Sequence, residues 1–260
     1  MLHHEISGNG KKPLVLLHGF MENTTIWNEM EAHLSKDFTL IKIDLPGHGK
    51  SKVYQEIHTV ELMAEKVKEV IDALKLEKIN LLGHSLGGYV SLAFAEKFPE
   101  ILESMTLFFS TTVADDEEKK AIRRRSIAVI DENFETFVKT SIPNLFSNNE
   151  KDILEGKIEL AKNIAKSTHK EGVKAAQLGM AERPDRTEIL ENLDAKILII
   201  AGKYDNAVKT ENLLKTIPEK TNIKTYVLDC GHNGHWEKPT ICAEIINTEL
   251  FHNLPKHFLL

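Results

Sequence analysis

Residues 79–94 decide the fold, and they read Ile-Asn-Leu-Leu-Gly-His-Ser-Leu-Gly-Gly-Tyr-Val-Ser-Leu-Ala-Phe. A short apolar run leads into the pattern Gly-x-Ser-x-Gly, from Gly83 to Gly87, and a helix-forming segment follows. This order is typical of a sharp strand-to-helix turn that holds a serine hydroxyl clear of the backbone. An ordinary glycine-rich turn could have similar residues. The predicted strand before the pattern and the predicted helix after it favour the nucleophile turn over that alternative. Ser85 is therefore a candidate nucleophile.

Short apolar runs of the same kind recur along the chain. Most are continuous rather than alternating, as in strands that are buried on both faces. We predict strands at Leu14–Leu17, Leu40–Ile43, Ile79–Leu82, Met105–Phe109, Ile197–Ala201 and Thr225–Leu228. Between them, residues 59–76 form an amphipathic helix pattern with Thr59 as N-cap, and a second helix should begin after Ser85 and end before Pro99. This alternation predicts an α/β fold with a doubly wound, mostly parallel sheet.

The alternation of strands and helices stops between about Thr112 and Pro184. That stretch contains helical periodicity and many Lys and Glu residues, but no convincing strand run. We therefore predict one core made of residues 1–111 and 185–260, with residues 112–184 inserted as a helical cap.

Composition limits the partners that the chain is expected to have. The net charge is −6 over 260 residues. Arg123–Arg125 are the only basic cluster and follow acidic Asp115–Glu118 closely, so we expect both to form a solvated helix surface rather than a nucleic-acid site. The start of the chain has no secretory pattern, and no apolar run approaches the roughly 18–20 residues of a membrane helix. With Cys230 and Cys242 as the only cysteines, we expect a soluble, cytoplasmic protein without a disulfide.

A serine hydroxyl needs a base that titrates near neutrality, and histidine is the usual one. His232 follows the last predicted strand, and His235 is its nearest competitor. Asp205 follows the strand at Ile197–Ala201 and would accept a hydrogen bond from the imidazole. The order Ser85, Asp205, His232, each after the end of a strand, predicts a catalytic triad. Surface positions are expected for His3, His4, His33, His58, His252 and His257.

The loop after the first predicted strand contains His18-Gly19-Phe20. A backbone N–H in this loop could join the N–H of Leu86 in binding a developing oxyanion. His18 itself is expected to be a hydrogen-bonded structural residue. The glycines of Asp44–Ser51 lack the spacing of a phosphate-binding loop and are interpreted as a tight loop beside the site.

These motifs resemble the α/β-hydrolase superfamily over essentially the full chain, and in particular compact bacterial carboxylesterase-like serine hydrolases with a helical cap. The resemblance is carried by His18-Gly19-Phe20, residues 44–51, the Gly83–Gly88 turn, Asp205, and Gly231-His232 followed by Glu237-Lys238-Pro239. It implies His232 rather than His235 as the base, Phe20 and Leu86 as oxyanion donors, and residues 183–186 as the junction where the cap returns to the core. One departure is the short N-terminus, so one of the family's two leading strands should be short or absent.

The resemblance implies a serine hydrolase that cleaves a small carboxylic ester or a related acyl bond and needs no cofactor or metal. Enol-lactonase, thioesterase and carbon–carbon bond hydrolase activities would share these motifs. A slow-turnover ligand-sensing protein of the same fold is an alternative from another class. The expected partner is a small acyl substrate; substrate-binding residues and oligomeric state stay open, because fold alone does not name a ligand.

Overall fold

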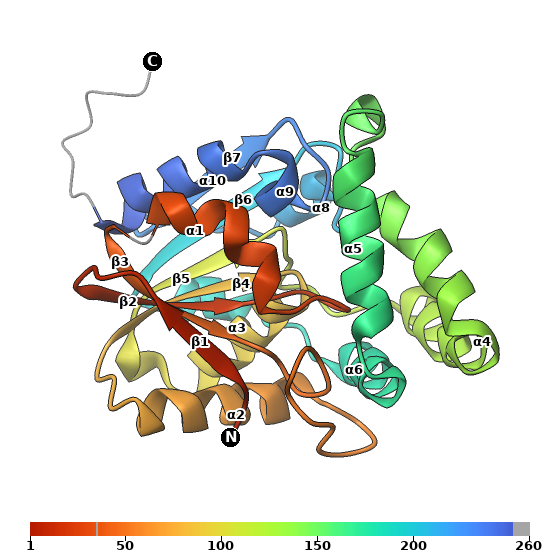
Figure 1. Ribbon diagram of the computed structural model, residues 1–260. Coiled ribbons are helices and arrows are strands. Elements are labelled where there is room, and N and C mark those ends of the chain that lie inside the picture. The colour runs from red at the N-terminus through yellow and green to blue at the C-terminus, as the bar shows by residue number, and fades with distance from the viewer. Residues whose placement is uncertain (35, 252–260) are drawn as a thin grey trace.

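The computed structural model describes residues 1–34 and 36–251, and a seven-stranded sheet forms its centre (Figure 1). Across the sheet the order is β1-β3-β2-β4-β5-β6-β7; β1 runs antiparallel to β3, and the other neighbours are parallel. The predicted fold class, a doubly wound and mostly parallel sheet, is confirmed. The strands are β1 His4–Ser7, β2 Lys12–Leu17, β3 Phe38–Ile43, β4 Ile79–His84, β5 Leu102–Phe108, β6 Lys196–Gly202 and β7 Ile223–Leu228.

Helices cover both faces of the sheet. In Figure 1, α2 and α3 lie below it, and α1 and α10 lie above it. The core helices are α1 Asn28–Leu34, α2 Val60–Ala73, α3 Leu86–Lys97, α7 Glu188–Asn192, α8 Thr210–Leu214, α9 Gly234–Glu237 and α10 Pro239–Ile246. Short 3-10 turns are η1 Thr24–Trp27, η2 Pro99–Ile101, η3 Ile142–Leu145 and η4 Asn148–Glu150, and a π-helical turn, η5, spans Asn247–Phe251.

Strand side chains alternate between two cores, which explains why the apolar runs are continuous. Odd-numbered positions such as Val15 and Leu81 pack on the side of α2 and α3. Even-numbered positions such as Leu16 and Leu82 pack on the side of α1 and α10. Because the period of a strand is two residues, each run supplies apolar side chains to both faces.

The two helices expected from the sequence are present. The Thr59 hydroxyl accepts the N–H of Leu62 at 3.1 Å and caps α2, while α3 ends at Lys97, before Pro99. β1 was not predicted: it is an edge strand of four residues that lacks a dense apolar run. It is the only strand before β2 in the described residues, as expected from the short N-terminus.

Three helices lie within the predicted cap, residues 112–184: α4 Glu117–Ser141, α5 Glu155–Ser167 and α6 Lys170–Glu182. They gather on one side of the molecule (Figure 1). α4 contains a non-helical residue, Asn133, whose Oδ1 accepts the N–H of Thr136 at 2.9 Å and caps the second half of the helix. The cap boundaries at residues 112 and 184 stay predictions.

The basic cluster at the start of α4 is not simply solvated, so that prediction was wrong in part. Asp115 is buried and pairs with Arg123 and with Arg183, the latter at 2.8 Å. The Arg183 guanidinium also stacks 3.9 Å from the ring centroid of Tyr89. A tertiary ion pair across 68 residues of chain has no local sequence signal. Arg124 and Arg125 are exposed as expected.

No helix within residues 1–34 and 36–251 is both long and apolar enough to cross a membrane. Cys230 and Cys242 are buried free thiols, and burial raises the pKa of Cys242 to about 12.

Candidate active site

Ser85 occupies the sharp turn between β4 and α3. Its backbone angles are φ 49° and ψ −109°, in a region that non-glycine residues rarely adopt. The turn is too crowded for side chains at its flanking glycines: a Cβ on Gly83 would lie 2.1 Å from the Gly87 carbonyl oxygen, and one on Gly87 would lie 2.3 Å from Leu17 O. The N–H of Ser85 donates to Phe108 O at 3.0 Å, which fixes the turn to β5.

Asp205 and His232 meet above the ends of β6 and β7. Asp205 Oδ2 lies 2.7 Å from His232 Nδ1, and both side chains are buried. Asp205 Oδ1 accepts the N–H groups of Ala207 and Val208, each at 2.8 Å. Burial alone would lower the pKa of His232, but the charge and hydrogen bond of Asp205 raise it above the ordinary value of 6.5. The contact therefore orients the imidazole and stabilises its protonated form.

Ser85 and His232 both line a cavity of about 600 Å³. Among the described residues no hydrogen bond joins Ser85 Oγ to His232, and the two residues share the wall of this cavity. The structure thus brings together the three residues predicted for the triad, with two of them in direct contact.

The two predicted oxyanion donors belong to different segments, the residue after Ser85 and the loop after β2. Leu86 is the first residue of α3, where backbone N–H groups have no partner within the helix. Phe20 follows β2 and lines the same cavity. In the described part of the chain, neither amide donates to a backbone carbonyl.

Glu237 holds the backbone of the His232 loop. Its Oε2 accepts the N–H of Gly231 at 2.9 Å and that of Ser147 at 3.1 Å, and its Oε1 accepts the N–H of Asn233 at 3.2 Å. Lys238 reaches Glu150 at 2.9 Å. These contacts tie the segment between η3 and η4 to the loop that carries His232.

The other histidines are distinguished by their surroundings. His18 is structural as expected, since its Nε2 accepts the N–H of Leu45 at 2.9 Å. His33 is exposed, and His3 and His4 are half-buried. His252 and His257 lie outside the described residues. The prediction of a surface position for His58 was wrong.

His58 is fully buried because the cap packs on it. Its N–H donates to Ala175 O of α6 at 3.0 Å, and its Nδ1 lies 3.1 Å from Pro46 O. Gly179, on the same helix, approaches so closely that a Cβ would lie 1.7 Å from His58 O. This contact depends on how α6 docks, which no local pattern encodes.

The cavity wall contains residues that the sequence did not single out. The cap supplies much of its apolar surface through Ile122, Phe137, Leu145 and Met180. Glu22 also lines the cavity and has no motif to mark it.

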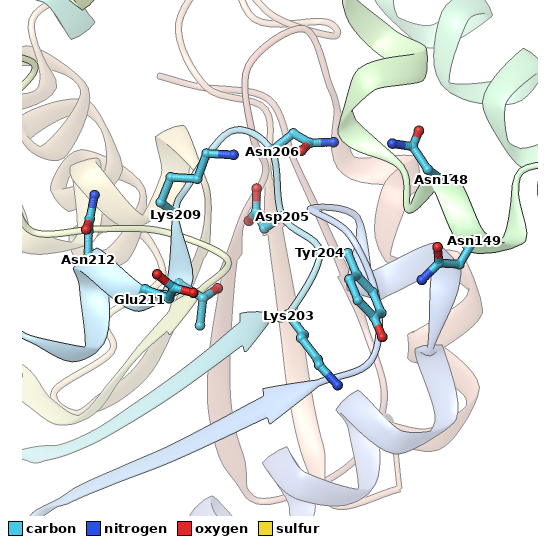
Figure 2. Close-up of a pocket in the computed structure, with 10 residues that line it drawn as sticks. Asn148, Asn149, Lys203, Tyr204, Asp205, Asn206, Lys209, Glu211 and Asn212 are labelled. Carbon is cyan, nitrogen blue, oxygen red and sulfur yellow. The ribbon is translucent and has the colours of Figure 1, made fainter.

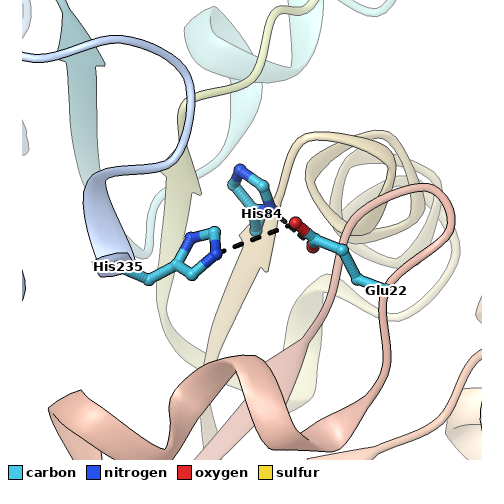
Figure 3. A group of neighbouring side chains, drawn as sticks. All are labelled: Glu22, His84 and His235. Atoms are coloured by element: carbon cyan, nitrogen blue, oxygen red, sulfur yellow. Dashed lines mark hydrogen bonds and ion pairs between the residues drawn. The ribbon is translucent and has the colours of Figure 1, made fainter. Parts of the chain in front are cut away.

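Glu22, His84 and His235 form a buried cluster, of which Glu22 and His84 also line the cavity (Figure 3). Their ligand atoms lie within 4.8 Å of one another, so these residues have the donor types of a metal site. His84 Nδ1 lies 2.8 Å from Glu22 Oε2, and His235 Nε2 lies 3.7 Å from Glu22 Oε1. Burial, with the nearby His84, holds the pKa of His235 well below its ordinary value, so His235 is neutral near neutral pH. Unlike His232, it does not contact Asp205 or line the cavity.

A second hollow, of about 440 Å³, adjoins the outer side of the Asp205 loop. Figure 2 shows Asn148 and Asn149 facing this loop from the cap side, with Tyr204 and Lys203 along its floor. Its wall is mostly polar, whereas the cavity at Ser85 is mostly apolar.

Comparison with known proteins identifies the family. Residues 12–239 match the family described as alpha/beta hydrolase fold, and the chain belongs to it. A thermophilic esterase from Thermogutta terrifontis superimposes with a TM-score of 0.88 and is 33% identical, over 95% of this chain and 91% of that one. The enol-lactonase from Burkholderia xenovorans LB400 has the same fold, with a TM-score of 0.87, 21% identity and 96% of each chain covered.

Sequence relatives include a hydrolase that is named for a different substrate. A 2-hydroxy-6-oxononadienedioate/2-hydroxy-6-oxononatrienedioate hydrolase from Escherichia coli is 27% identical over 249 residues, which cover 91% of this chain and 86% of the relative. Uncharacterized proteins from Mycobacterium tuberculosis and Mycobacterium bovis are 35% identical over 111 residues, and this match spans only 32% of their length. The chain is therefore similar to hydrolases that are named for different substrates.

Proposed function

We propose that this protein is a serine hydrolase that cleaves a small carboxylic ester through an acyl-enzyme, with Ser85, Asp205 and His232 as its triad. The observation that carries the proposal is the 2.7 Å contact between Asp205 and His232 above a cavity that Ser85 also lines. The strained backbone of Ser85 supports it, because this turn exposes the hydroxyl to the cavity.

In this mechanism, His232 Nε2 takes the proton of Ser85 Oγ while that oxygen attacks the carbonyl carbon. Asp205 keeps the proton on Nδ1, so that Nε2 is free to act as the base. The oxyanion accepts the N–H groups of Phe20 and Leu86. His232 then gives its proton to the leaving alcohol, and a water molecule repeats the sequence on the acyl-enzyme.

The cavity suggests a small substrate with an apolar part. Its volume of about 600 Å³ is in the range of sites for small organic ligands. Phe137 and Leu145 from the cap and Val208 from the core supply apolar surface. We assign the chemistry to the core residues and the substrate choice to the cap. An enol-lactone or a carbon–carbon bond would use the same core residues.

The test is acylation and turnover by wild type and Ser85→Ala. Short-chain p-nitrophenyl esters, an enol-lactone and a vinylogous diketone form the substrate panel, and a fluorophosphonate probe is located by mass spectrometry. Ser91→Ala is a matched control, because Ser91 lies in α3, shortly after Ser85, and its hydroxyl donates to Gly87 O at 2.8 Å. We expect the label on Ser85, retained in Ser91→Ala and lost in Ser85→Ala. Acylation at Ser85 without turnover would favour a ligand-sensing role, and labelling elsewhere would refute the assignment.

A further inference from the structure

A buried carboxylate lies beneath the loop that carries Phe20. Glu22 is only 7% exposed. Its Oε2 accepts the N–H of Gly19 at 2.5 Å and lies 2.8 Å from His84 Nδ1. Figure 3 shows Glu22 and His84 pointing toward each other from different segments of the chain. One oxygen atom therefore joins the loop after β2 to the residue directly before Ser85.

The connection continues from His84 to the third loop of the site. His84 Nε2 lies 3.1 Å from the backbone oxygen of His232. Two side chains, Glu22 and His84, thus link the Phe20 loop, the Ser85 turn and the His232 loop. Buried networks of this kind fix geometry when every member is paired.

The loop itself needs such support. Met21 has a φ of 58°, which is unfavourable for a residue with a side chain. The turn is closed twice: the N–H of Glu22 donates to Gly19 O at 3.3 Å, and the N–H of Gly19 donates to the Glu22 carboxylate. Phe20 lies inside this closed turn, so its N–H direction depends on the contact with Glu22.

We propose that Glu22 is a positioning residue, whose carboxylate aims the Phe20 N–H at the oxyanion by binding Gly19 on one side and His84 on the other. This inference rests on the proposed serine-hydrolase function. The donor set with His235 also fits a divalent transition metal, but a metal bound by His84 Nδ1 would remove the contact between that nitrogen and Glu22 Oε2. The observed contacts therefore favour positioning over metal binding.

Removing the carboxylate should impair the chemical step rather than binding. Glu22→Ala leaves the Gly19 N–H without its acceptor and releases the loop. We expect kcat for a p-nitrophenyl ester to fall about 10- to 100-fold, with KM within about threefold, because a misdirected oxyanion donor acts mainly in the transition state.

Two further variants probe the same contact. Gly19→Ala places a Cβ 2.6 Å from Glu22 Oε2 and 2.7 Å from His84 Nδ1, so it should reproduce the kcat loss. Glu22→Gln keeps an acceptor oxygen for Gly19 and His84 and should retain kcat within about threefold. Because the Glu22 charge helps to raise the pKa of His232, the acid limb of the Glu22→Gln rate profile should move to lower pH.

Glu31→Ala is the matched control, since Glu31 pairs with Lys42 at 2.7 Å and does not line the cavity. Its kcat should equal that of wild type. Circular dichroism and thermal unfolding check that each variant folds. If Glu22→Ala does not fold, the kcat values of Gly19→Ala and Glu22→Gln test the proposal instead. Folded Glu22→Ala or Gly19→Ala with near-wild-type kcat, or a loss confined to KM, would overturn the proposal.

Two other results would also overturn it. Equal losses of kcat in Glu22→Ala and Glu22→Gln would mean that the negative charge of Glu22, rather than its hydrogen bonds, supports catalysis. Activity lost on EDTA treatment and restored by Zn²⁺ would assign the cluster to a metal. Failure of the proposed function is distinguishable from all of these, because wild type itself would then not be labelled at Ser85.

Discussion

Replacing Asp205 by asparagine should abolish most of the activity while leaving the fold intact, and the structure dictates why. Oδ1 of Asp205 accepts two backbone N–H groups, from Ala207 and Val208, each at 2.8 Å. In Asp205→Asn the amide oxygen must stay on that side, because an NH2 group there would oppose two donors. The NH2 group is then turned toward His232 Nδ1, where Oδ2 lay at 2.7 Å.

The size of the loss follows from this orientation. A donor facing Nδ1 makes that nitrogen an acceptor and moves the imidazole proton to Nε2, which then cannot take the proton of Ser85. A triad with the wrong tautomer loses about 10⁴-fold in kcat, or about 5.4 kcal/mol of transition-state stabilisation. The two bonds to Ala207 and Val208 persist, so we expect only a small change in thermal stability.

The assay is the initial rate of p-nitrophenyl acetate hydrolysis from pH 5 to 9. Asp229→Asn is the matched control, because Asp229 is three residues before His232 but is 73% exposed and pairs with Lys203. It should keep the wild-type rate. If Asp205→Asn folds and its kcat stays within about tenfold of wild type, the reasoning is refuted. Either the amide then has the opposite orientation, or His232 is not the base.

Three further outcomes are expected. His232 must be neutral to act as a base and its pKa is raised above 6.5, so kcat/KM should fall as pH drops through a midpoint above 6.5; a midpoint at or below 6.5 would contradict this. Gly83→Ala should lower kcat about 100-fold and lower the Tm, since its Cβ would lie 2.1 Å from Gly87 O. Gly156→Ala, with nothing within 4 Å, should be neutral or slightly stabilising, and equal effects at the two glycines would contradict the crowding argument. Asp115→Ala should lower the free energy of unfolding in urea by about 3 kcal/mol, because it leaves Arg183 buried and unpaired; the exposed Glu117→Ala is the control, and an unchanged midpoint would be the contrary result.

The sheet and the helices that flank Ser85 could be predicted because their signals are local. Continuous apolar runs mark strands that are buried on both faces, and Thr59 and Pro99 mark where α2 begins and α3 ends. Asp205 and His232 could be predicted because the triad residues occur in the order Ser, Asp, His along the chain, each after the end of a strand. Their 2.7 Å contact agrees with that rule, since both residues follow parallel strands whose ends share one edge of the sheet.

Contacts that depend on docking between distant segments could not be predicted. His58 looked like a loop residue, yet α6 buries it from more than a hundred residues away. Asp115 looked solvated, but it pairs with Arg183 at the far end of the cap. Glu22 belongs to no motif, and only the folded chain brings it to His84. In each case the local sequence is compatible with an exposed polar residue, and a partner that is distant in the sequence determines whether the residue is buried.

The site combines fixed backbone with a variable wall, and three carboxylates account for the fixed part. Each accepts backbone N–H groups from a different loop: Asp205 from Ala207 and Val208, Glu22 from Gly19, and Glu237 from Gly231, Ser147 and Asn233. A buried carboxylate that binds several N–H groups resists displacement, because breaking those bonds leaves a charge unpaired in a medium of low dielectric. Reacting groups held in this way need no rearrangement during the reaction. Apolar cap side chains such as Ile122, Phe137 and Leu145 line the cavity and cannot form side-chain hydrogen bonds. Substitutions at these positions should therefore change which substrates react, whereas substitutions of the three carboxylates should change how fast any of them reacts.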